Sequence, residues 1–85
     1  MPTILREDGY RFFFFSLDWK EPLHVHVEYG DKYAKFWLKP VTLARSWGFR
    51  SHEITQIRKI VEENENFFES KWNEYFSDKN RTPRR

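Results

Sequence analysis

The sequence predicts an α+β fold, in which an antiparallel β-meander of three to five strands packs against one long C-terminal helix. Short alternating runs bounded by Gly, Pro and Asp, typical of strands, fill the first half of the chain. After residue 50, apolar residues recur at helical spacing over about 25 positions. A chain of 85 residues makes one domain, which we place at residues 1–77.

The two N-terminal strands are expected at about residues 3–6 and 10–17. A turn that contains Asp8 and Gly9 joins them. The second strand contains the run Phe12–Phe15, and four consecutive rings predict a strand that is buried on both faces. Residues 18–22 are expected to form a loop, because Pro22 lacks the N–H that a central strand donates.

Strict alternation at residues 23–29 and 32–39 predicts a β-hairpin. Gly30 and Asp31 lie between these runs and suit a two-residue loop of type II′. Such a loop fixes the register of the two strands. One face of the hairpin is then apolar, and the other carries the cross-strand pairs His24–Trp37, His26–Lys35 and Glu28–Tyr33.

The C-terminal half is expected to hold a short strand at about 41–43 and the helix at about 51–76. Ser51 is a suitable N-cap for that helix. Asn64 interrupts its apolar stripe, so the pattern also allows a bend or a polar contact there. Residues 78–85 are rich in Arg and are predicted to form a disordered basic tail.

Composition limits the classes of protein. The chain has no cysteine, which excludes disulfides and thiolate metal sites. It also has no apolar run near the roughly 18 residues of a membrane span, so we expect a cytoplasmic protein without a membrane partner. The net charge of +2 permits nucleic-acid binding without requiring it. Aromatic residues make up 20% of the chain, more than a small core holds, which favours a homo-oligomer or partner interface.

His24 and His26 are the candidate catalytic residues, because two positions apart on a strand both imidazoles project from one face. Two such rings suit an acid and a base around one phosphate. They also suit a metal ion, with Asp18 or Glu28 as a third ligand. Lys35 beside His26 disfavours a second cation and favours an anion, so no cofactor is expected. A polar sheet face that happens to hold two histidines explains the pattern equally well.

Three other residues are candidates for binding RNA or phosphate together with Lys35. Tyr33 and Trp37 share the histidine face, and exposed rings beside cations are what single-stranded RNA stacks on. Arg45 lies near the turn before the helix, where it can reach an anion. The alternative is that the rings form a minor second core and that both cations are solvated.

The chain also resembles a family of short bacterial proteins, the domain of unknown function 4160 family. The resemblance covers residues 1 to about 77. It rests on the opening Met-Pro-Thr-Ile-Leu-Arg, the run Arg11–Phe14, Pro22-x-His24-Val25-His26-Val27, Ala34-Lys35-Phe36-Trp37-Leu38-x-Pro40-Val41, Gly48-Phe49 and Trp72-x-x-Tyr75-Phe76. The family pattern tends to have a histidine where this chain has Trp19, so the three-histidine metal site that the pattern suggests is incomplete here.

What the resemblance implies is a small protein encoded in a toxin–antitoxin-like pair, with no assigned activity. Together with the histidine face it leads to a toxin-like RNA-binding protein, with metal-independent endoribonuclease activity as its catalytic form. The first alternative is a non-enzymatic interaction module: a homo-oligomer, or the partner or antitoxin-like member of a two-protein complex. A small metal-dependent hydrolase is the third hypothesis.

Overall fold

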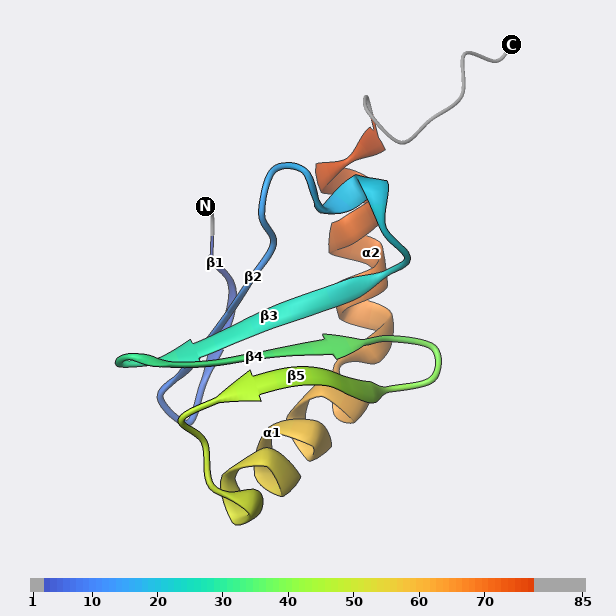
Figure 1. The fold of residues 1–85 in the computed structure, drawn as a ribbon. Coiled ribbons are helices and arrows are strands. Elements are labelled where there is room, and N and C mark those ends of the chain that lie inside the picture. Colours follow the sequence, from blue (N-terminus) through green and yellow to red (C-terminus); the bar gives the residue numbers. More distant parts are fainter. Residues whose placement is uncertain (1–2, 78–85) are drawn as a thin grey trace, which may run out of the picture.

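The computed structural model describes residues 3–77, which form one five-stranded sheet and two α-helices (Figure 1). In chain order the elements are β1 (Thr3–Glu7), β2 (Tyr10–Phe13), the short 3-10 helix η1 (Asp18–Lys20), β3 (His24–Tyr29), β4 (Lys32–Trp37), β5 (Thr42–Trp47), α1 (Ser51–Glu63) and α2 (Glu65–Tyr75). The strands lie in the order β1-β2-β3-β4-β5 and every neighbouring pair is antiparallel. The predicted α+β meander is therefore confirmed.

Both helices pack on the same face of the sheet, where the core forms (Figure 1). Each strand turns alternate residues toward that face, and the helices bring their apolar stripes to it. The residues of the core are Tyr10, Phe12, Phe14, Val25, Val27, Ala34, Phe36, Leu38, Ile57, Ile60, Val61, Phe68, Trp72 and Phe76. The other sheet face is left for polar and aromatic side chains.

The hairpin of β3 and β4 has the predicted register. Val25 pairs with Phe36 and Val27 with Ala34 on the core side, and Tyr29 pairs with Lys32 next to the two-residue loop. Gly30 has φ 62°. The loop therefore uses the left-handed region at its first position, as a type II′ turn requires.

Two strand boundaries differ from the prediction. β2 ends at Phe13 instead of residue 17, because the chain leaves the sheet and Phe14 packs into the core while Phe15 is 42% exposed. The run of four rings is thus not buried on both faces throughout. β5 is longer than the predicted 41–43 and extends to Trp47, since it pairs with β4 along its whole length around a bulge.

The prediction of one long helix over 51–76 is wrong, because the helix is interrupted at Asn64. Asn64 has φ −115° and ψ 17°, outside the helical region. Its side-chain Nδ2 donates a hydrogen bond of 2.8 Å to the carbonyl of Ile60, which also accepts the Asn64 backbone N–H at 3.1 Å. The side chain competes for a helical carbonyl, and α2 begins again at the next residue.

None of the described helices is apolar over a stretch long enough to cross a membrane. The predicted basic tail at 78–85 lies outside the described residues.

Candidate functional site

The two histidines of β3 project to the side of that strand opposite the core residues Val25 and Val27. In the register of β3 and β4, His24 pairs with Trp37 and His26 with Lys35, as the sequence predicts. Directly paired residues of antiparallel strands project to the same side. The four side chains are therefore neighbours.

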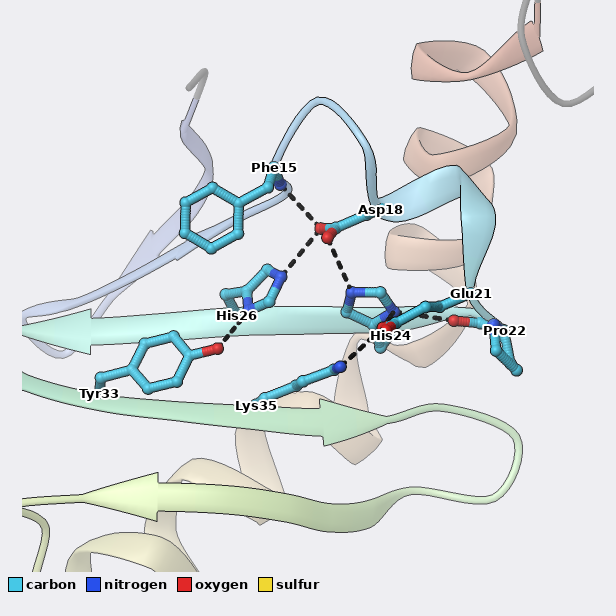
Figure 2. Close-up of polar contacts among 8 residues, drawn as sticks. All are labelled: Phe15, Asp18, Glu21, Pro22, His24, His26, Tyr33 and Lys35. Carbon is cyan, nitrogen blue, oxygen red and sulfur yellow. Dashed lines mark hydrogen bonds and ion pairs between the residues drawn. The ribbon is translucent and has the colours of Figure 1, made fainter.

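A carboxylate from the connection between β2 and β3 reaches both imidazoles (Figure 2). Asp18 is the first residue of η1, which folds over the face. Its Oδ2 lies 2.9 Å from Nε2 of His26, and its Oδ1 lies 3.1 Å from Nε2 of His24. Asp18, which the sequence suggested only as a third metal ligand, is thus the centre of the cluster.

Each member of the cluster is held by a second contact on its outer side. Nδ1 of His24 lies 2.8 Å from the carbonyl of Pro22, and Nδ1 of His26 lies 2.7 Å from the Tyr33 hydroxyl. The backbone N–H of Phe15 donates to Oδ2 of Asp18 at 2.7 Å. These contacts fix the orientation of both rings and of the carboxylate.

The short distance between His24 and Asp18 is not a hydrogen bond. Nε2 of His24 is buried and has no hydrogen-bond partner within the part of the chain that the structure describes. Its carboxylate neighbour lies within ion-pair distance but away from the direction that a hydrogen bond requires. The buried Nε2 thus points toward Asp18 without satisfying its own lone pair or proton.

Aromatic rings close the cluster off from water. The His24 ring lies 5.5 Å from the ring of Trp37 and 5.2 Å from that of Trp72, and the residue is 0% exposed. The His26 ring stacks on Phe13 and meets the edge of Phe15 at 4.5 Å, which leaves the residue 4% exposed.

Burial determines the protonation of His26. Loss of hydration lowers the pKa of its imidazole to about 4, against the opposing attraction of the Asp18 carboxylate. The ring is therefore neutral near pH 7. Burial also raises the pKa of the Tyr33 phenol, so its hydroxyl keeps its proton.

The side chain of Lys35, a predicted phosphate-binding residue, is engaged within the protein. Its Nζ donates to Oε1 of Glu21 at 2.7 Å and lies 4.5 Å from the ring centroid of Trp37, and the residue is 5% exposed. The hydrogen bond from Lys35 lowers the pKa of the Glu21 carboxyl. Sequence reasoning missed Glu21, whose only signal was a carboxylate three residues before His24 in the same loop.

The remaining predicted residues lie along the same face toward β5. Arg45 pairs with Lys35, and Tyr33 pairs with Trp47. Arg45 is exposed and Trp47 is 64% exposed, whereas Tyr33 and Trp37 are half-buried. Trp47 was missed because the sequence placed it in a turn after a strand that ended at 43.

The comparisons with known proteins give one match. A family model described as Domain of unknown function (DUF4160) matches residues 9–73, a segment that contains the whole cluster. The curated proteins and the solved structures yield no match to this chain.

Proposed function

The chain belongs to the DUF4160 family, and from the geometry of the face beside the cluster we propose that it binds single-stranded RNA. The observation that carries the proposal is the strip on β4 and β5 where an aromatic pair, Tyr33–Trp47, lies next to the exposed cation Arg45. Stacking rings beside cations that contact phosphates are the two elements of single-strand recognition.

Trp47 and Arg45 are the residues most open to a ligand. Trp47 is 64% exposed, and within residues 3–77 neither a hydrogen bond nor an ion pair engages the Arg45 side chain. Both lie on an edge strand of the sheet, so a polymer can run along them without threading into the molecule. Lys35 is paired with Glu21 at 2.7 Å, which leaves Arg45 as the cation that contacts phosphate.

RNA cleavage by His24 and His26 draws less support from this arrangement. A general acid or base has to come within hydrogen-bond reach of the reacting oxygen. His24 is 0% exposed and His26 4% exposed. We therefore limit the proposal to RNA binding. RNA cleavage and growth inhibition on expression are measured as separate properties.

The test is the affinity for a fluorescein-labelled single-stranded RNA, measured by anisotropy at several salt concentrations. Trp47→Ala should weaken binding about 5- to 150-fold, the equivalent of about 1–3 kcal/mol for one lost stacking contact. Arg45→Ala should lower the slope of log K against log salt by about 0.7, because one phosphate contact is lost.

Matched controls lie on the helices. Phe67→Ala removes a ring that is 39% exposed on α2, and Lys59→Ala removes an exposed cation on α1. Both should bind RNA as the unchanged protein does. Equal loss in the control and the test variants, or no binding of the unchanged protein, rules the proposal out.

A second candidate function is a protein-interaction module, favoured by the exposed apolar residues of the β2–β3 connection. Phe15 is 42% and Leu17 61% exposed, side by side with the cluster. Light scattering after size exclusion tests this candidate in its homo-oligomeric form. A strict monomer at all concentrations, unaffected by Leu17→Glu, contradicts it.

A further inference from the structure

We propose that Asp18, His24 and His26 bind one divalent transition-metal ion, and that Zn²⁺ is the ion this ligand set favours. Each residue offers one ligand atom, and the three atoms lie within 4.8 Å of one another. The inference stands apart from RNA binding, because it concerns the buried cluster and not the exposed strip.

The contact between His24 and Pro22 selects the tautomer of the buried imidazole. The carbonyl of Pro22 can only accept a hydrogen bond, so Nδ1 of His24, 2.8 Å away, carries a proton. In the neutral form of this tautomer, which is the form that binds metal ions, Nε2 is a bare lone pair that lies 3.1 Å from an oxygen of Asp18, which is also an acceptor. Two acceptors that face each other in a buried site repel, and a cation between them removes the repulsion.

The outer contacts of the three residues are of the kind that metal ligands make. Metal-bound histidines usually donate their other ring N–H to a carbonyl, a carboxylate or a similar acceptor, which orients the ring and selects the tautomer. His24 meets the Pro22 carbonyl in this way, and Nδ1 of His26 lies 2.7 Å from the Tyr33 hydroxyl oxygen, which can accept. The Phe15 N–H holds Asp18 from the third side at 2.7 Å.

The spacing of the ligand atoms is close to that of a tetrahedral zinc site. Ligands at about 2.0–2.1 Å around a tetrahedral Zn²⁺ are about 3.3 Å from one another. Here the carboxylate oxygens lie 3.1 Å and 2.9 Å from the two Nε2 atoms. Both distances are slightly shorter than that spacing, so the carboxylate has to move away from the two rings to admit an ion. Three protein ligands fill three of the four positions of a tetrahedral site.

The charge around the cluster also permits a dication. The sequence alone suggested that Lys35 repels a metal ion, but Lys35 is paired with Glu21 at 2.7 Å. Because imidazole ligands bind a metal ion in their neutral form, the ligand set of two imidazoles and one carboxylate carries one negative charge. Two imidazoles and one carboxylate favour Zn²⁺ and its transition-metal neighbours over Mg²⁺ and Ca²⁺, which prefer oxygen ligands alone.

The experiment is calorimetric titration of the full-length chain, purified without a histidine tag and freed of metal by a chelator. Zn²⁺ should bind with a stoichiometry of one, and an excess of Mg²⁺ should not compete. Asp18→Asn, His24→Gln and His26→Gln should each weaken Zn²⁺ binding by more than about 100-fold, because loss of an outer contact alone costs about 10- to 100-fold.

His52→Gln is the matched control. His52 is exposed on α1, away from the cluster, so its loss should leave the affinity unchanged. Circular dichroism checks that each variant is folded. If a variant fails to fold, the unchanged protein still decides: Zn²⁺ at about 100 times its Kd should lower the unfolding constant about 100-fold, and Co²⁺ should give the intense visible absorption of a tetrahedral site.

Two results overturn the proposal. One is an unchanged protein that takes up neither Zn²⁺ nor Co²⁺ at equimolar concentration, which leaves the cluster as a hydrogen-bonded network. The other is a loss of binding in His52→Gln as large as in the three ligand variants. RNA affinity measured in the presence of chelator is independent of both, so the two proposals fail separately.

Discussion

At the scale of single residues, Tyr33 joins the two halves of the site. Its hydroxyl contacts Nδ1 of His26 at 2.7 Å, and its ring lies across from Trp47 on the open strip. The hydroxyl orients a proposed metal ligand, while the ring offers a surface to a base. A variant that loses the hydroxyl and keeps the ring separates these two roles.

Tyr33→Phe should weaken Zn²⁺ binding about 10- to 100-fold, because His26 loses the contact that orients its ring. RNA affinity should stay within about 2-fold, since the ring that stacks remains. Titrations with Zn²⁺ and with labelled RNA on the same preparation measure both. Tyr75→Phe, which changes an exposed tyrosine of α2, is the control. An RNA affinity that falls with the Zn²⁺ affinity contradicts this division of roles.

The neighbours of the histidines were predictable residue by residue, and their surroundings were not. Alternation and a two-residue loop determine that His26 lies beside Lys35, because the side-chain period of a strand is two. The contact between Lys35 and Glu21 depends on how an irregular loop folds over the sheet. The sequence pattern carries no signal for the fold of that loop. It therefore did not predict that the loop covers the histidine face.

At the scale of elements, the hydrogen bonds of one side chain set the start of α1. Oε1 of Glu53 accepts the backbone N–H of Arg50 at 2.8 Å, and its Oε2 accepts from Nζ of Lys32 at 3.0 Å. The same carboxylate thus caps α1 and ties it to β4. The interruption at Asn64 is local too, and a polar residue within an apolar stripe was its only signal.

The Glu53 carboxylate should make stability depend on pH in the acid range. The Arg50 N–H and then Lys32 lower its pKa below the value of 4.5 that it has in the unfolded chain. Its contribution is therefore present above pH 4.5 and lost as pH falls through the folded pKa. Urea unfolding should show Glu53→Gln less stable than the unchanged protein at pH 7, with the difference disappearing in acid. Glu62→Gln, an exposed change on the same helix, should show no such difference.

At the scale of the whole molecule, the described core lies between one layer of helices and one sheet. A domain of this size has an unfolding free energy of about 5–15 kcal/mol, so single core residues matter. The fold class was predictable because the apolar residues of the chain follow two repeats. They recur at every second residue in the strands and about every 3.6 residues in the helices. The ends of β2 and β5 were not, since tertiary packing of Phe14 and pairing with β4 decide them.

Phe68→Ala should cost about 3–5 kcal/mol of unfolding free energy, because it leaves a cavity in the centre of the core. Phe68 is 0% exposed, and its ring lies 5.5 Å from that of Phe12 across the helix–sheet interface. Urea unfolding measures the loss. The neighbouring Phe67, 39% exposed, should cost less than about 1 kcal/mol when changed to Ala. Equal costs at the two positions contradict this placement of the core.

The three proposed ligands all come from residues 18–26, within a single strand and the short connection before it. The entropy lost in closing a loop grows with the logarithm of its length, so bringing Asp18 to His24 costs little compared with contacts between distant segments. The cluster is therefore a local feature of the chain, and of its surroundings it is the contact with Trp72 that requires α2. An ion bound there would hold the connection between β2 and β3 against the strand that follows it, without tying distant parts of the chain together.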